Sequence, residues 1–300
     1  MDKKRVWLPG AGGQLGNALT RHFGDHPEIK WIPTTRDQLN LNYEEDIRKF
    51  FALYRPDVVV NAAAFTHVDG AEVNHSDALQ LNAKVPAILA ELCADSGSVL
   101  IQISTDHIFG GDLSKSGEEA YSETDNPSPA NYYGETKLQG EETIRETMER
   151  YYILRTAWLY SPYGHNFYKS IRRKALEGVP FRVVTDEIGS PSSAITLAET
   201  VVDFILRLGT EQEIPYGIYN CVNRGSVSRY EFARAILDLD PDTRELEILS
   251  CLQEDLQSAA DRPKFASLSM HKMERYAPEV VKDWREALQE VYDTDIQDKR

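Results

Sequence analysis

The 300-residue sequence has few cysteines. The three that it has, Cys93, Cys221 and Cys251, are odd in number, widely spaced and free of any CxxC pair. This pattern indicates neither a disulfide framework nor a zinc site. The seven histidines are scattered without ligand spacing, so we expect no catalytic metal. Reduced thiols favour a cytoplasmic protein.

Basic residues and long apolar runs are also scarce. There are 33 Lys and Arg against 48 Asp and Glu, a formal net charge of −15. Nucleic-acid phosphates repel such a chain, so we expect no nucleic-acid partner. The longest near-apolar run, Val58 to Phe65, is interrupted by Asn61 and falls short of the roughly 20 residues that a membrane span needs. We therefore expect no membrane segment, and no signal peptide is indicated.

What the first half does contain is an alternation of short apolar runs with polar, helix-periodic stretches. The predicted strands are Val6–Pro9, Trp31–Pro33, Asp57–Asn61, Val99–Ser104 and Tyr152–Arg155. The predicted helices are Gln14–Phe23, Glu44–Tyr54, Ser76–Asp95 and Asn131–Arg150. Strand–helix alternation at this spacing predicts an α/β fold, a Rossmann-type doubly wound parallel sheet with the ligand crevice at the carboxyl ends of its strands.

The second half is less regular and predicts a smaller mixed α/β domain that binds substrate. Strands are predicted at Phe181–Thr185 and Ile218–Val222, and helices at Leu197–Leu208, Arg229–Leu237 and Val281–Tyr292. We therefore expect a dinucleotide-binding domain at residues 1–160 and a substrate domain at 161–300, with some segments of the second returning to pack on the first.

A glycine-rich turn follows the first predicted strand. Gly10, Gly13 and Gly16 form GxxGxxG, with Leu15 where the stricter GxGxxG pattern would have glycine. Glycines at these places permit a tight turn and a close approach of backbone to pyrophosphate. The following helix offers free N–H groups and its positive dipole end. An acidic protein can hold a dinucleotide in this way with few cationic side chains.

The residues after the second strand bear on the choice of cofactor. Arg36 at this place can accommodate a 2′-phosphate, whereas Asp37 can accept from a 2′-hydroxyl. Arg36 favours NADPH, and NADH remains open.

An acid–base group is indicated by three residues. Tyr133 and Lys137 are four apart, so they share one face of a predicted helix, and Thr105 ends a predicted strand. A ketone that accepts a hydride also needs a proton, which a tyrosine can supply. A neighbouring ammonium lowers the pKa of a phenol, and a strand-end hydroxyl can bond the same oxygen. This combination predicts a carbonyl reductase.

With these residues in hand, the chain resembles the dTDP-4-dehydrorhamnose reductase family of the extended short-chain dehydrogenase/reductase superfamily. The matching segments span nearly the whole sequence. They are Gly10–Gly16, 61–66, Val68-Asp69, Ala71-Glu72, Asn82, 104–109, Tyr133-Gly134 with Lys137, 155–158, Asn166-Phe167, Gly189-Ser190-Pro191 and Arg262-Pro263.

The resemblance implies that NADPH, or NADH, reduces the C4 ketone of dTDP-4-dehydro-L-rhamnose to dTDP-L-rhamnose in nucleotide-sugar and polysaccharide biosynthesis. It implies Tyr133 as proton donor, Lys137 as the residue that lowers its pKa and binds the nicotinamide ribose, and Thr105 as orienting the ketone. The remaining implied cofactor residues are Gly10, Gly13, Gln14, Leu15, Gly16, Arg36, Asn40, Ala62, Ala63, Ala64, Thr66 and Asn82. The remaining implied substrate residues are Val68, Asp106, His107, Trp158 and Asn166, the last on the diphosphate.

The chain departs from the usual family pattern at several positions. Asn40 stands where an aspartate is usual, Phe65 and His107 stand where tyrosine is usual, and Ser192 replaces threonine. These changes put an adenine contact and the details of the sugar pocket in question.

Two other functions remain open. A dehydratase of the same superfamily would carry Thr-Asp-Glu, but this chain has Thr105-Asp106-His107 and lacks that base; an epimerase or another nucleotide-sugar reductase is a variant of the same alternative. Reductase-like chains also serve as non-catalytic regulatory subunits of methionine adenosyltransferase, against which the Tyr133–Lys137 pair argues. As for partners, the resemblance is compatible with a homodimer, since relatives are often dimers.

Overall fold

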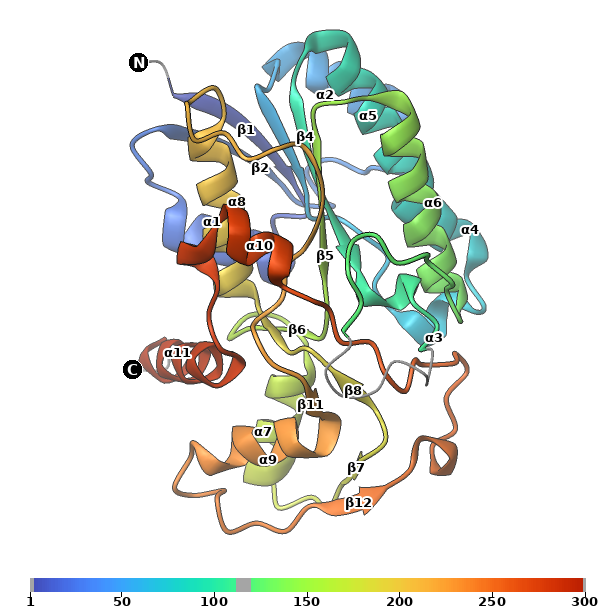
Figure 1. Ribbon diagram of the computed structural model, residues 1–300, viewed down its shortest axis with the longest axis vertical. Helices are drawn as coiled ribbons and strands as arrows, with labels where there is room; N and C mark the ends of the chain where they lie inside the picture. The colour runs from blue at the N-terminus through green and yellow to red at the C-terminus, as the bar shows by residue number, and fades with distance from the viewer. Residues whose placement is uncertain (1–2, 112–119, 299–300) are drawn as a thin grey trace.

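The computed structural model describes residues 3–111 and 120–298. Its centre is a six-stranded parallel sheet with the order β10-β5-β4-β3-β1-β2. The strands are β1 (Lys4–Pro9), β2 (Ile29–Thr34), β3 (Val58–Asn61), β4 (Val99–Thr105), β5 (Tyr151–Thr156) and β10 (Gly217–Asn220). The predicted doubly wound parallel sheet is therefore confirmed (Figure 1).

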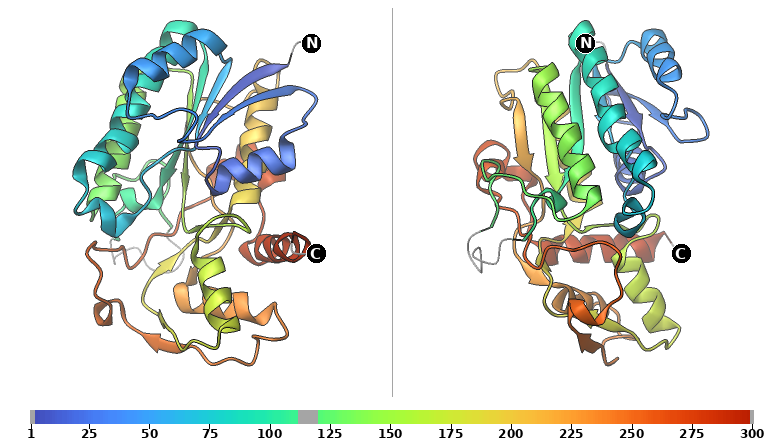
Figure 2. Two further views of the ribbon diagram at one scale, coloured as in Figure 1. Left: turned by 180° about the vertical axis from the view of Figure 1, so that it is seen from behind. Right: turned by 90° about the vertical axis from the view of Figure 1, so that its right-hand side faces the viewer.

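Helices cover both faces of this sheet (Figures 1 and 2). One face carries α1 (Gln14–Phe23) and α8 (Ala194–Arg207), and the other carries α2 (Glu44–Tyr54), α5 (Val85–Ser96) and α6 (Tyr132–Thr147). Successive side chains of a strand point to opposite faces. Val6 and Leu8 accordingly enter the core under α1 and α8, while Trp7 between them enters the core under α2 and α5.

The predicted helix Ser76–Asp95 is divided in the structure into three pieces. These are α4 (His75–Leu79), a π-helical turn η1 (Gln80–Lys84) and α5. Pro86 lies in the first turn of α5 and has no N–H to donate. The carbonyl oxygen of Asn82 instead lies so close to α6 that a Cβ at Gly140 would come within 2.2 Å of it. Periodicity alone does not distinguish such a turn from regular helix.

The chain after residue 160 builds a second core from α7 (Phe167–Leu176), α9 (Arg229–Asp238) and α11 (Trp284–Gln297). Short strands accompany it in three pairs. They are β7 (Arg182–Val184) with β12 (Leu249–Cys251), β8 (Ile188–Gly189) with β11 (Val227–Ser228), and β6 (Leu159–Tyr160) with β9 (Ser192–Ser193). We propose the domain division at 160/161 on the ground of this second core.

Two segments of the second half return to the first. α8 packs against α1, and β10 adds a parallel edge strand beside β5. The short helices α3 (Val68–Ala71) and α10 (His271–Tyr276) complete the elements used below. Across residues 3–111 and 120–298, no helix combines the length and the apolar character that crossing a bilayer requires.

Candidate active site

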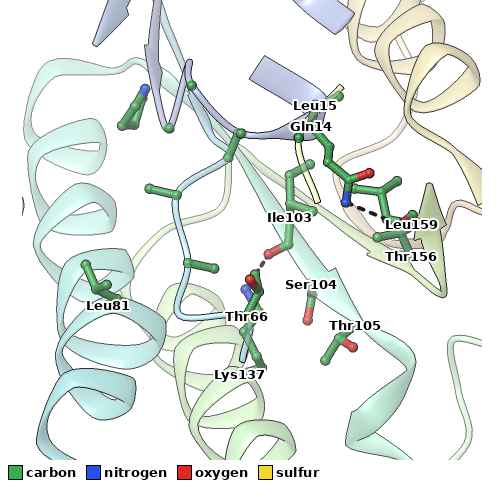
Figure 3. A pocket seen from close by; sticks show the side chains of 18 of the residues that line it. Gln14, Leu15, Thr66, Leu81, Ile103, Ser104, Thr105, Lys137, Thr156 and Leu159 are labelled. Atoms are coloured by element: carbon green, nitrogen blue, oxygen red, sulfur yellow. Dashed lines mark hydrogen bonds between the residues drawn. The ribbon is translucent and has the colours of Figure 1, made fainter. Parts of the chain in front are cut away.

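A cleft of about 810 Å³ opens at the carboxyl ends of the parallel strands. Figure 3 shows part of its lining, with Gln14 on one side and Thr105 and Lys137 on the other. Sixteen of the residues expected at a cofactor or substrate line it: Gly10, Gly13, Gln14, Leu15, Arg36, Asn40, Ala62, Ala63, Ala64, Thr66, Val68, Thr105, Asp106, His107, Trp158 and Asn166. Tyr133 and Lys137 line it as well. The expected residues Gly16 and Asn82 do not.

The glycine loop forms the floor of one end. Gly10 has φ +86°, and a Cβ there would come within 2.6 Å of the Ala62 backbone, so only glycine fits. α1 then begins at Gln14, with Gly13 as an N-cap that makes no side-chain cap bond and with no acid in the first turn. The N–H groups of that turn therefore remain available for an anion. Gly16 serves packing, because a Cβ there would meet Gly10 and Ala11.

The adjoining wall comes from the segment after β3. Asn82 does not reach the cleft but fixes this segment: its Oδ1 accepts from the Phe65 N–H at 2.9 Å and its Nδ2 donates to the Phe65 carbonyl at 3.1 Å. It acts on the site through the backbone around Ala64 and Thr66. Arg36, at the outer end of the cleft, is exposed.

Tyr133, Lys137 and Thr105 meet where β4 ends and α6 begins. Asn131 caps α6 by accepting from the Gly134 N–H at 2.9 Å, which places Tyr133 and Lys137 in its first two turns. Both are buried. The Lys137 ammonium donates to the Ile103 carbonyl at 2.6 Å, a bond drawn in Figure 3. Thr105 donates to Asp106 at 3.0 Å.

The pKa values in this group are set mainly by burial. Burial raises the pKa of Tyr133 to about 12, although contact with the Thr105 side chain acts in the opposite direction. The pKa of Tyr133 is thus raised, whereas we expected the neighbouring Lys137 ammonium to lower it. Burial also lowers the pKa of Lys137 to about 8, against the attraction of Glu141. A tyrosine that keeps its proton at neutral pH suits the role of proton donor.

A buried ion pair supports the two strands under this group. Arg155 of β5 donates to Glu141 of α6, with a shortest distance of 2.7 Å, and the exposed fractions of the two side chains are 2% and 1%. Ser104 of β4 donates to the same carboxylate at 2.5 Å. Glu141 thus joins α6, β4 and β5 directly behind Lys137 and Thr105.

The other end of the cleft is built from charged and aromatic side chains. Trp158 has a left-handed φ of 45°, and a Cβ at Gly189 would come within 2.5 Å of its indole. On the indole lies the Arg229 guanidinium, 3.6 Å from a ring centroid, with Glu187 as its ion-pair partner at 3.5 Å. Arg229 lines the cleft but was missed by sequence reasoning, since no spacing relates it to a motif.

Asn166, which was expected to contact the substrate diphosphate, also has a structural role. Its Oδ1 accepts from the Lys169 N–H at 3.0 Å as the N-cap of α7, and its Nδ2 donates to Gln14 Oε1 and to the Ser161 carbonyl, both at 2.9 Å. A substrate phosphate would have to displace one of the Nδ2 bonds. Gln14 itself joins the glycine loop to the second half, because it also donates to the Leu159 carbonyl at 3.3 Å (Figure 3).

A loop of the second half closes over the first near Val68. Asp69 of α3 accepts from the backbone N–H groups of Ala259 and Ala260, each at 3.1 Å, and pairs with Arg262 at 2.6 Å. We call these four residues the clasp. The Arg262 hydrogen bonds hold the pKa of Asp69 at about 2. Within residues 3–111 and 120–298, no His, Cys, Asp and Glu side chains gather into a metal site.

Comparison with known proteins agrees with this geometry. Residues 4–296 match the family described as RmlD substrate binding domain. The chain is 36% identical over 286 residues to the spore coat polysaccharide biosynthesis protein SpsK of Bacillus subtilis, covering 95% of this chain and 96% of that protein. It is 31% identical over 291 residues to a dTDP-4-dehydrorhamnose reductase of Aggregatibacter actinomycetemcomitans, covering 96% and 98%.

A solved structure is similar throughout. The dTDP-4-dehydrorhamnose reductase of Bacillus anthracis, crystallised in complex with NADP, superposes with a TM-score of 0.88 at 32% identity, covering 97% of this chain and 99% of that one. Similarity of this extent in both sequence and fold means that the chain belongs to the RmlD substrate binding domain family.

Proposed function

We propose that this protein is a dTDP-4-dehydrorhamnose reductase, which uses NADPH to reduce the C4 ketone of dTDP-4-dehydro-L-rhamnose to dTDP-L-rhamnose. The observation that carries the proposal is the convergence of Tyr133, Lys137 and Thr105 on the same cleft as the glycine loop. Relatives named for this reaction match nearly the whole chain. The expected role in nucleotide-sugar biosynthesis in the cytoplasm follows from the same proposal.

The residues at the glycine end fit a dinucleotide. The close approach of Gly10 to Ala62, the uncapped first turn of α1 and the exposed Arg36 provide a backbone cradle, an anion site and a cation. When bound, the nicotinamide supplies the hydride. The exposed Arg36 that follows β2 can accommodate a 2′-phosphate, which supports NADPH over NADH.

The chain's own residues supply the proton and hold the ketone. Tyr133, protonated at neutral pH, donates its phenolic proton to the oxygen of the reduced carbonyl. The hydroxyl of Thr105 orients that oxygen and stabilises its developing charge. The Lys137 ammonium stabilises the phenolate left behind, and its bond to Ile103 fixes its position. Glu141 and Arg155 hold the two supporting strands in register.

The proposal is tested by incubating the purified protein with NADPH and dTDP-4-dehydrorhamnose. We expect substrate-dependent loss of absorbance at the reduced-nicotinamide band and formation of dTDP-L-rhamnose, identified by NMR. A panel of other nucleotide 4-ketosugars, each run with NADPH and with NADH, serves as the control. NADPH binding without turnover of any ketosugar would overturn the proposal and favour a non-catalytic binding subunit.

A further inference from the structure

His107 has one ring nitrogen whose hydrogen-bonding role is determined by the protein. It lies in the short turn η2 (Asp106–Ile108) directly after β4, lines the cleft and packs edge-on against the Tyr133 ring with centroids 5.4 Å apart. Its Nδ1 is 2.9 Å from Nδ2 of Asn131. The partner atom decides which tautomer this contact allows.

The orientation of the Asn131 amide is determined by two other bonds. Its Oδ1 accepts from the Gly134 N–H at 2.9 Å, which caps α6. Its Nδ2 donates to the Asp261 carbonyl at 2.8 Å. Exchanging the two amide atoms would place two acceptors together at Asp261 and two donors together at Gly134, so the amide cannot be flipped. The remaining Nδ2 hydrogen therefore points to His107, and Nδ1 of His107 is an acceptor.

A histidine that accepts at Nδ1 carries its proton on Nε2. Charged groups face this ring from several elements: Asp106 beside it, Arg229 and Glu187 across the cleft, and Arg262 of the clasp. Burial outweighs their sum and lowers the pKa of His107, so the ring stays neutral. Among the described residues Nε2 has no hydrogen-bond partner. The ring thus offers the cleft a single polar function, a donor.

We propose that His107 is a specificity-determining residue, whose Nε2–H donates a hydrogen bond to an acceptor oxygen on the sugar of the nucleotide-sugar substrate, and that Asn131 is the positioning residue that holds this tautomer. The inference rests on the proposed function. The tyrosine usual at this position in the family can donate or accept, whereas this histidine only donates. A site whose side chain can only donate a hydrogen bond rejects ligands that leave this donor unpaired.

The tautomer can be tested without turnover. Protein labelled with ¹⁵N-histidine is examined by NMR with NADPH bound, and the His107 signals are assigned by their loss in His107→Gln. We expect an unprotonated Nδ1 and a protonated Nε2 at neutral pH. In Asn131→Ser a side-chain oxygen can still cap α6 but the donor to Nδ1 is lost, so the tautomer with its proton on Nδ1 should become populated. A protonated Nδ1 in the unaltered protein overturns the inference.

The substrate contact is tested by kinetics. His107→Phe should raise KM for the ketosugar about tenfold with a smaller change in kcat, since one hydrogen bond of about 1–1.5 kcal/mol is lost. His107→Gln, whose amide nitrogen can replace the Nε2 donor, should restore most of the affinity. Asn131→Ser should raise KM by less than His107→Phe does, because only the molecules with the proton on Nδ1 lose the donor. Unchanged dissociation constants for NADPH show that each variant is folded.

The two proposals fail differently. An unaltered protein that turns over no ketosugar refutes the proposed function, whatever the tautomer. An active unaltered protein whose KM is the same in His107→Phe, or is raised equally in His107→Phe and His107→Gln, refutes the donor role of His107 and leaves the proposed function intact.

Discussion

The two ends of the cleft are built by different means. The glycine end consists of backbone and small side chains, such as Gly10 and Ala62, and comes from consecutive strand–helix units of the first half. The other end, where we propose that the sugar binds and which we call the sugar end, contains half-buried charged and aromatic side chains, among them Trp158 and Arg229, which come from distant parts of the chain. The glycine end can hold a ligand because side-chain atoms are absent there. The sugar end depends instead on which charged and aromatic side chains contact one another.

This difference explains how an acidic protein can hold two phosphate-bearing ligands. Backbone N–H groups and a helix dipole bind anions without adding net charge. At the sugar end, the positive charge of Arg229 is balanced locally by Glu187, and that of Arg262 in the clasp is balanced by Asp69. Changes at the glycine end should therefore alter cofactor binding, whereas changes at the sugar end should alter substrate KM. Tyr133, the proposed proton donor, lies between the two ends, so a change there should alter neither cofactor binding nor the KM for substrate.

The largest effect is expected at this boundary. Tyr133→Phe removes the phenolic proton but keeps the ring that packs against Ala71 and Ala78. We expect kcat to fall by about 10²–10⁴-fold, the usual contribution of a positioned acid, while the dissociation constant of NADPH changes less than about threefold. Stopped-flow kinetics and fluorescence titration measure the two. Equal losses of turnover and of cofactor binding would mean that the residue is structural.

The next effect concerns the glycine end. Gly10→Ala places a Cβ 2.6 Å from the Ala62 backbone at a φ of +86°, and strain plus overpacking should lower the free energy of unfolding by about 2–5 kcal/mol. The matched control is Gly209→Ala, which has a φ of +74° but nothing within 4 Å of the added Cβ, and should cost about 1 kcal/mol. Urea denaturation compares the two, and equal losses would contradict the close approach.

The same contrast explains what the sequence could predict. The glycine loop, the Tyr133–Lys137 pair and the positions of the first five strands along the chain each depend on local spacing, and the structure places them as expected or close to it. The order of the strands within the sheet was not predicted. Arg229 could not be found, because it reaches Trp158 only after some 70 intervening residues have folded. The capping bonds of Asn166 and the direction of the Tyr133 pKa depend on burial and long-range partners, which no local pattern contains.

The third prediction tests whether Arg36 binds the 2′-phosphate of the cofactor rather than the diphosphate of the substrate. Arg36 is exposed at the outer end of the cleft, so Arg36→Ala should change little in the fold. We expect KM for NADPH to rise about tenfold, one charge-assisted contact of about 1.5 kcal/mol, with KM for NADH and for the ketosugar unchanged. Steady-state kinetics with each cofactor provide the measurement. A parallel rise for NADH would place Arg36 away from the 2′-phosphate.

The fourth prediction concerns the clasp, where we expect a change in KM for the substrate and none in KM for the cofactor. Asp69→Asn keeps the shape of the side chain but removes the charge that pairs with Arg262. Because the pair is partly exposed, we expect only a two- to fivefold rise in KM for the ketosugar, about 0.5–1 kcal/mol, with KM for NADPH unchanged. Asp57→Asn is the control. It weakens a comparable ion pair with Arg5 near the amino-terminal end of β1, away from the cleft, and should leave both KM values unchanged. A rise in KM for NADPH in Asp69→Asn would break the proposed separation of the two ends.

The last prediction concerns pH, and its effect between pH 7 and pH 8 is the smallest of the five. Burial lowers the pKa of Lys137 to about 8, so its ammonium is lost as the pH rises through that value, whereas Tyr133 keeps its proton until about pH 12. Since kcat/KM reports groups of the free enzyme, kcat/KM for NADPH should fall by about half between pH 7 and pH 8, by about fivefold between pH 8 and pH 9, and by about tenfold per pH unit above that. Lys137→Met should lower the whole profile and abolish this limb. A limb that persists in Lys137→Met would assign it to another group, and the lysine would then contribute through its bond to Ile103 rather than through its charge.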